Sequence, residues 1–118
     1  MLGLRTCIYR VPELEKAKQW YAKVFRTEAY FDEPFYVGFE IAGYELGLMP
    51  DQVKVSSDNV MTYWGVEDID TEFARCLELG AAIHEEPNNV GGDIMVASII
   101  DPWGNVIGLI YNPHFHLH

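Results

Sequence analysis

The chain has 118 residues, of which 49% are hydrophobic and 22% are charged, a composition that fits one globular domain and excludes disordered and fibrous classes. Its longest apolar run, residues 94–100, is far shorter than the roughly 20 residues of a membrane-spanning helix, so no membrane association is expected. The formal net charge is −10, and most of it comes from residues 57–118, which contain ten Asp and Glu but only one basic residue, Arg75. This acidity disfavours a nucleic-acid partner and either attracts a cationic ligand or keeps the chain soluble.

The N-terminus and the cysteines bear on the compartment. Arg5 stands where a secretory signal would carry its apolar stretch, and no small-residue cleavage site follows, so a cytoplasmic location is expected. Cys7 and Cys76 are too far apart in the sequence for a metal-ligand or redox spacing. They are predicted to be reduced, buried thiols.

The first half of the chain predicts a strand, a helix and three further strands. A short apolar run up to Val11 precedes an amphipathic segment. Apolar residues recur there at helical spacing at Leu14, Ala17, Tyr21, Val24 and Phe25. Strand candidates follow at 29–32, 36–41 and 44–49, bounded by Glu33-Pro34 and Ala42-Gly43. Tyr30, Phe31, Phe35 and Tyr36 form an aromatic cluster around the first of these turns, suited to either a pocket rim or an interface.

The second half repeats the order. A strand at 60–66 precedes a helix that begins after Asp68, a predicted N-cap, and ends at Gly80, where a left-handed C-terminal residue is expected. Strand candidates follow at 82–86, 93–100 and 106–111, the last two joined by Asp101-Pro102-Trp103-Gly104-Asn105.

The repeat extends to individual residues. Gly43-Tyr44-Glu45-Leu46-Gly47-Leu48 matches Gly104-Asn105-Val106-Ile107-Gly108-Leu109 at its glycines and its leucine. The chain is therefore predicted to be an α+β protein of two tandem β-α-β-β-β modules, one at about 1–56 and one at about 57–118, within a single domain, 1–118.

These features resemble the glyoxalase/bleomycin-resistance/dioxygenase group, the vicinal oxygen chelate superfamily. The resemblance rests on Val11-Pro12-Glu13-Leu14 through Trp20-Tyr21-Ala22-Lys23-Val24-Phe25, on the strand at 60–66 with its helix, and on the segment from Asp101 to Leu109. It implies two modules forming a cup-shaped, partly closed mixed sheet with the helices outside. It also implies a homodimer.

In metal-using members of that superfamily, the first and last strands of each module supply four metal ligands. The internal repeat assigns these positions to Thr6, Gly47, Met61 and Gly108. Hydroxyl, thioether and hydrogen are poor or absent donors for divalent transition metals. Glu45 is the one nearby carboxylate, and one carboxylate does not build a site. The sequence therefore predicts that the cup holds no metal and no other cofactor.

Without metal ligands, the two glycines are expected to open volume on the concave face and make it a ligand pocket. Trp103, in a Pro-Trp-Gly turn, is expected to be partly exposed at a ligand entrance or a dimer contact. Candidate ligand-binding residues are Thr6, Ile8, Arg10, Glu45, Gly47, Met49, Met61, Tyr63, Trp103, Gly108 and Ile110. The alternative interpretation is that the larger of these side chains only fill a small core.

Three functions fit this sequence. The first is a metal-free protein of the bleomycin-resistance type that binds a small organic molecule, cationic or aromatic. The second is a glyoxalase-like lyase or isomerase, or a dioxygenase-type enzyme. It is either metal-dependent through an alternative ligand set or metal-free, with Glu45, Tyr63 or Arg10 moving protons and Glu45 as the candidate catalytic residue. The third is a non-catalytic sensing or dimerisation module.

The histidines carry little of this argument. His84 is expected to face solvent. His114, His116 and His118 alternate at the C-terminus and predict either a frayed tail or a weak metal-binding strand.

Overall fold

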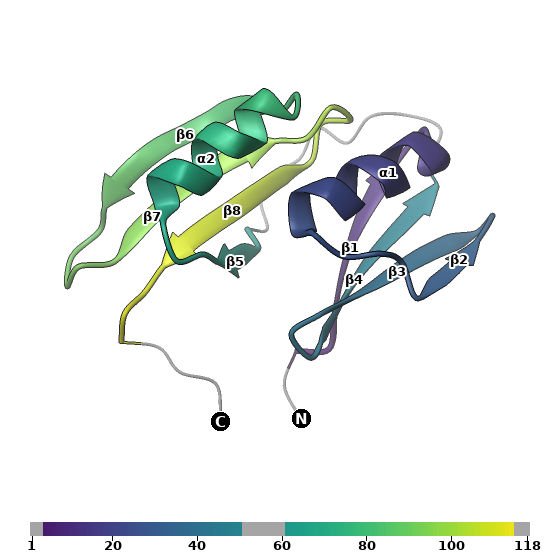
Figure 1. Ribbon diagram of the computed structural model, residues 1–118, viewed down its shortest axis with the longest axis horizontal. Coiled ribbons are helices and arrows are strands. Elements are labelled where there is room, and N and C mark those ends of the chain that lie inside the picture. Colours follow the sequence, from purple (N-terminus) through teal and green to yellow (C-terminus); the bar gives the residue numbers. More distant parts are fainter. Residues whose placement is uncertain (1–3, 51–60, 115–118) are drawn as a thin grey trace. The chain divides into compact units, whose positions relative to one another are not determined.

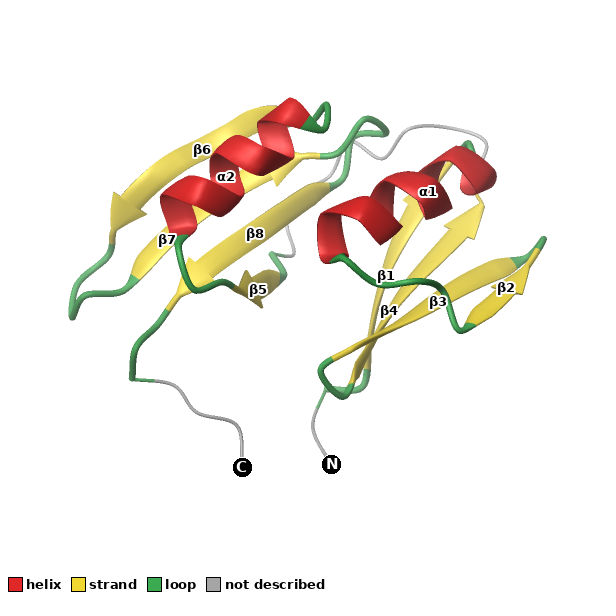
Figure 2. Cartoon of the chain, viewed as in Figure 1, coloured by secondary structure: helices red, strands yellow, loops and turns green. Residues whose placement is uncertain are grey.

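The computed structural model describes residues 4–50 and 61–114, and the chain divides into two compact units, Met1–Ser56 and Ser57–His118. Each unit contains one helix packed on a four-stranded mixed sheet. Figure 1 shows the elements coloured along the sequence, and Figure 2 shows them coloured by secondary structure. The predicted α+β class and the tandem β-α-β-β-β order are therefore confirmed. Neither helix in the described part of the chain is long and apolar enough to cross a membrane.

The first unit, called module one below, folds its sheet in the order β1-β4-β3-β2. Strands β1 and β4 are parallel, and the other pairs are antiparallel. Its elements are β1 (Thr6–Val11), α1 (Leu14–Phe25), β2 (Phe31–Glu33), β3 (Tyr36–Ile41) and β4 (Tyr44–Pro50). Strand β2 is shorter and later than the predicted 29–32, although the Tyr30 amide still donates to the Gly38 carbonyl.

The second unit, module two, repeats this topology in the order β5-β8-β7-β6, with β5 and β8 parallel. Its elements are β5 (Tyr63–Gly65), α2 (Ile69–Glu78), β6 (Ala82–Asn89), β7 (Met95–Ile100) and β8 (Val106–Tyr111). Strand β6 runs past the predicted residue 86, with register shifts on both sides of Glu85. Pro87 lacks the amide that a regular ladder needs, and such interruptions are tolerated in an edge strand such as β6.

The ends of α2 follow the sequence signals. The Asp68 carboxylate accepts a hydrogen bond from the Thr71 amide at 3.2 Å, which confirms Asp68 as the N-cap and lowers the pKa of its carboxyl group. Gly80 has a φ of 105°, and the amides of Gly80 and Ala81 donate to the carbonyls of Leu77 and Cys76. This is the paired C-terminal hydrogen bonding that a left-handed glycine permits.

Alternation along the strands of module one gives its sheet a helix-covered face and an opposite face, here called the open face. Helix α1 buries Ala17, Tyr21 and Val24 against strands β3 and β4. The Tyr9 ring of β1 lies 5.7 Å from the Tyr21 ring, which places Tyr9 on the helix-covered face. Leu46, Leu48, Val37 and Phe39 share that parity and are buried. The remaining parity forms the open face.

Candidate functional site

The open face of module one brings together most of the predicted ligand-binding residues of the first half. Strands β1 and β4 pair so that Thr6 lies opposite Glu45, Ile8 opposite Gly47, and Arg10 opposite Met49. All six share one parity along adjacent strands, so they belong to one face of one sheet. The geometry thus assembles this part of the predicted site within a single module.

Glu45 is held by two tyrosines. The Tyr30 hydroxyl donates to Glu45 Oε1, and the Tyr36 hydroxyl donates to Glu45 Oε2 at 2.6 Å. Burial raises the pKa of Tyr36, so its hydroxyl keeps its proton and remains a donor through neutral pH. These three side chains are called the tyrosine clamp below.

Two glycines make room for the clamp. A Cβ at Gly47 would overlap the Tyr36 hydroxyl oxygen, and one at Gly38 would lie 3.4 Å from Glu45 Oε1 and from the rings of both tyrosines. Gly38 and Gly47 are cross-strand partners. The expectation that Gly47 leaves open volume is therefore wrong, because the Tyr36 ring fills the space beside its backbone.

The sequence did not identify Tyr30 and Tyr36 as partners of Glu45. The sequence groups them with Phe31 and Phe35 only as an aromatic cluster at a turn. A usable signal was present, because Tyr36 and Gly38 have the parity that faces Gly47 once β3 and β4 pair as a hairpin. The contribution of β3 to the open face is the step that was missed.

Exposed apolar side chains share the open face with the tyrosine clamp. The Phe31 ring lies 6.1 Å from the Tyr36 ring and 6.1 Å from the Phe35 ring. Ile8, Phe31 and Met49 are 47%, 40% and 37% exposed. Apolar and aromatic side chains with a few polar groups are the residue types that line small-molecule sites.

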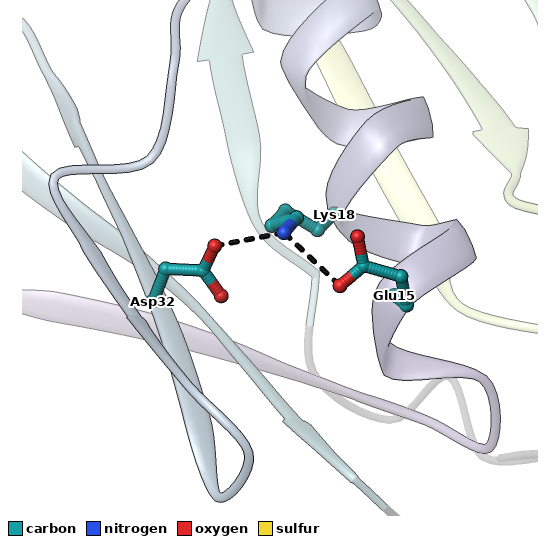
Figure 3. A network of polar contacts seen from close by, with 3 residues as sticks. All are labelled: Glu15, Lys18 and Asp32. Atoms are coloured by element: carbon teal, nitrogen blue, oxygen red, sulfur yellow. Dashed lines mark hydrogen bonds and ion pairs between the residues drawn. The ribbon is translucent and has the colours of Figure 1, made fainter.

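An ion-pair network attaches the β2 strand to the helix. Lys18 Nζ lies 2.7 Å from Asp32 Oδ2 and 3.0 Å from Glu15 Oε2, as Figure 3 shows. Hydrogen bonds to Asp32 and then Glu15 raise the pKa of Lys18. Asp32 lies two residues from Tyr30, so this contact helps to place the clamp.

Module two has a different arrangement at the equivalent place. Tyr63, Gly108 and Ser98 lie opposite one another across β5, β8 and β7. A Cβ at Gly108 would lie 2.6 Å from Tyr63 Cδ1 and 2.7 Å from the Thr62 carbonyl oxygen, so Gly108 is also covered by a tyrosine ring. The expected open volume is wrong here too.

Two further predicted residues of module two, Ile110 and Met61, are close in sequence to Gly108 and Tyr63. Ile110 is half-buried two positions beyond Gly108 on β8, and Met61 is half-buried two positions before Tyr63. Tyr63 itself is 43% exposed. The Ser98 hydroxyl is buried and lies 2.7 Å from Nδ1 of His84, which is exposed as predicted.

Trp103 corrects a prediction. Its side chain is 5% exposed, so it offers no ring face to a ligand entrance or a dimer contact. The Asp101 carboxylate is itself buried and accepts from the amides of Trp103 and Asn105 and from Asn105 Nδ2. These three bonds close the turn compactly, and burial of the large ring is favoured by the hydrophobic effect.

A divalent metal does not fit the positions that the family resemblance assigns to its ligands. Thr6 and Met61 provide a hydroxyl and a thioether, and Gly47 and Gly108 provide no donor. Tyrosine rings lie against both glycines. Across residues 4–50 and 61–114, no three His, Cys, Asp or Glu side chains are grouped to hold a metal.

The remaining predicted groups are the C-terminal histidines and the two cysteines. His114 Nε2 lies 2.8 Å from the Gly92 carbonyl oxygen, whereas His116 and His118 fall outside the described residues. Neither Cys7 nor Cys76 forms a disulfide with a described residue; Cys76 is buried, which raises the pKa of its thiol, and Cys7 is only half-buried, not buried as predicted.

Comparison with protein families gives one match that covers most of the chain. The model of the Glyoxalase/Bleomycin resistance protein/Dioxygenase superfamily matches residues 3–109. No curated protein sequence matches the chain.

Solved structures share the fold at low sequence identity. A glyoxalase-related enzyme from Fulvimarina pelagi superposes with a TM-score of 0.83 at 14% identity, covering 100% of this chain and 94% of that one. A fosfomycin resistance protein from Listeria monocytogenes gives 0.76 at 18% identity, covering 97% and 94%. A lactoylglutathione lyase from Agrobacterium tumefaciens gives 0.76 at 17% identity, covering 98% of each chain. At these identities the likeness concerns the fold alone.

Proposed function

The chain belongs to the Glyoxalase/Bleomycin resistance protein/Dioxygenase superfamily, and from that premise we propose that it is a metal-free protein of the bleomycin-resistance type that binds a small organic molecule. The tyrosine clamp on the open face of module one carries this proposal. It places hydrogen-bonding groups among exposed apolar side chains, and Tyr36 lies against Gly47, at a position where metal-using members carry a ligand. We propose a homodimer as the working form.

Two observations support ligand binding without a metal. Both oxygens of Glu45, the nearby carboxylate, already accept hydrogen bonds from phenols, and the four assigned positions lack carboxylate or imidazole donors. The apolar groups around the clamp, Ile8, Phe31 and Met49, supply the contact area that an organic ligand needs. Binding then depends on contact area and hydrogen bonds.

Native mass spectrometry of the full chain, purified without chelators, tests this proposal. We expect a dimer, either bare or carrying an organic adduct, and whole-number binding of added aromatic compounds without turnover. The matched control lacks residues 114–118, which removes the terminal histidines. One divalent metal per chain, retained by that truncated control, would contradict the proposal.

A second candidate function is catalysis by a member of the same superfamily without the usual ligands. The observation that favours it is the 2.6 Å hydrogen bond between the Tyr36 hydroxyl and Glu45, since a phenol and a carboxylate in contact form a proton donor and acceptor pair. Glu45→Gln would then abolish turnover of a substrate while leaving the fold intact. Unchanged turnover in Glu45→Gln would remove Glu45 from the reaction.

A further inference from the structure

We propose that Lys18 is a positioning residue of the proposed ligand site: through Asp32 it fixes the place of Tyr30, one of the two phenols of the tyrosine clamp. Lys18 extends from α1, on the helix-covered side of the sheet, so it acts on the site without contacting a ligand on the open face. The inference rests on the proposed function, because only a ligand on the open face gives the placement of Tyr30 a role in binding.

The two phenols of the clamp are held to different extents. Tyr36 is half-buried within β3, and its ring lies against Gly47 of the neighbouring strand. Tyr30 precedes β2 and is 63% exposed, so packing constrains it less. Its amide donates to the Gly38 carbonyl, and its hydroxyl donates to Glu45 Oε1. The position of the Tyr30 hydroxyl therefore depends on where the backbone at the start of β2 lies.

Strand β2 has little packing of its own to fix that backbone. Its three residues are all exposed, and the strand forms an edge of the sheet beyond β3. Helix α1 packs on β3 and β4. Asp32 is the β2 residue on the helix-covered side, because it pairs with the buried Val37. A contact from α1 to Asp32 therefore ties this edge strand to the rest of the module.

Lys18 makes that contact. Its Nζ lies 2.7 Å from Asp32 Oδ2, and Figure 3 shows the ammonium between Asp32 and Glu15. Glu15 is three residues earlier on α1 and lies 3.0 Å from the same ammonium, so the helix itself helps to direct Lys18. An ion pair that is partly exposed to solvent contributes modestly to stability. Its loss should therefore displace β2 and release the Tyr30 hydroxyl from Glu45 without unfolding the module.

Nuclear magnetic resonance of the full chain tests this inference. Lys18→Met keeps most of the side chain and removes its charge. We expect the ring signals of Tyr30 to shift and its amide to exchange with solvent about two- to fivefold faster, whereas amides between β3 and β4 keep their wild-type rates. Lys18→Arg retains the charge and should keep the wild-type Tyr30 signals. Asp32→Asn should reproduce Lys18→Met, and combining the two changes should add nothing further.

The matched control is Lys16→Met. Lys16 lies on the same helix and its Nζ is 3.0 Å from Glu13 Oε2, so this variant also removes one lysine and one ion pair, but not one that joins α1 to β2. It should leave the Tyr30 signals unchanged. Wild-type Tyr30 signals in Lys18→Met, or equal changes in Lys16→Met, would refute the role of Lys18. Equal acceleration of the amides between β3 and β4 would also overturn it, since the whole module would then be destabilised.

These signals are measured without an added ligand, which separates the inference from the proposed function. Changes confined to Tyr30, in a chain that binds aromatic compounds in native mass spectrometry, would support both. The same changes in a chain that binds none of them would refute the proposed function and leave Lys18 as the residue that places Tyr30. Binding of aromatic compounds by a chain in which Lys18→Met leaves Tyr30 unmoved would refute the role of Lys18 alone.

Discussion

The two modules share one strand order but stabilise their last hairpins differently. In module one, β3 and β4 are joined by Ala42 and Gly43, which are exposed and have φ angles of 49° and 95°. In module two, β7 and β8 are joined by the turn that Asp101 closes with three hydrogen bonds, and both Asp101 and Trp103 are buried. One turn depends on backbone conformation and the other on buried side chains.

The open face of module one also differs from the face of module two that carries Tyr63, Gly108 and Ser98. Each has a glycine covered by a tyrosine ring, but Tyr36 comes from β3 and contacts Glu45, whereas Tyr63 comes from β5 and is separated from Ser98 of β7 by Gly108 of β8. Module one thus carries two carboxylates at this place, and module two carries a buried serine hydroxyl paired with His84. The repeated backbone therefore fixes which positions a side chain must cover, whereas the residue types at those positions differ between the two modules.

The largest effect is expected at the buried turn. Asp101→Ala removes three hydrogen bonds and leaves buried donors unsatisfied, so we expect the free energy of unfolding to fall by about 2–4 kcal/mol. Denaturant unfolding measures this. Glu40→Ala, at the exposed turn of module one, should change it by less than about 0.5 kcal/mol. Equal losses in both variants would show that the two turns do not differ in their contribution.

The covered glycines are expected to rank next. Gly108→Ala places a Cβ 2.7 Å from the Thr62 carbonyl oxygen, and because backbone gives way less easily than a side-chain tip, we expect a loss of about 1–3 kcal/mol. Gly47→Ala meets the tip of Tyr36 instead, so it should displace the tyrosine clamp at a smaller cost. Gly65→Ala, with no atom within 4 Å of its Cβ, is the matched control. The prediction fails if Gly65→Ala destabilises as much as Gly108→Ala.

A smaller effect is expected within the clamp. Tyr36→Phe removes the hydrogen bond to Glu45, and we expect a loss of about 1 kcal/mol at neutral pH. Burial raises the pKa of Tyr36, so the protonated phenol is favoured by folding. Its contribution is complete below the ordinary tyrosine pKa of about 10 and is lost as the pH rises through the folded value. The difference in the free energy of unfolding between wild type and Tyr36→Phe should therefore narrow at alkaline pH. A difference that does not change with pH would contradict the role given to the Tyr36 hydroxyl.

The smallest effect is expected at the helix caps, which also differ between modules. Asp68 caps α2 with its side chain, whereas Glu13, at the same place before α1, makes no such bond. We expect Asp68→Ala to lower the midpoint of thermal unfolding and Glu13→Ala to leave it almost unchanged.

The pH dependence identifies the cause. The hydrogen bond to Thr71 lowers the pKa of Asp68, so its contribution is present above the ordinary carboxyl range and disappears as the pH falls through the folded value. The gap between Asp68→Ala and wild type should close with acidification. A gap that persists below the folded pKa would assign the effect to helix propensity.

Much of the fold was predictable from local patterns. Helical spacing from Leu14 and the alternation of residues 36–41 and 106–111 placed α1, β3 and β8, because these segments carry their period in their own residues. Strand β6 was less predictable, since its pairing continues beyond Pro87 only through contact with β7. In the site, strand alternation correctly places Thr6, Ile8 and Glu45 on one face. It does not include the side chains that β3 contributes to the same face.

The sequence by itself determined the duplicated strand order, the Asp68 cap and the absence of metal-ligating side chains at the four assigned positions, because each depends on residue type and local spacing. Tertiary structure alone decided that Tyr36 covers Gly47, that two phenols hold Glu45 and that Trp103 is buried. These outcomes depend on side-chain rotamers and on strands paired across a turn. Alternation specifies the face on which a side chain lies, whereas packing against neighbouring strands specifies what it touches.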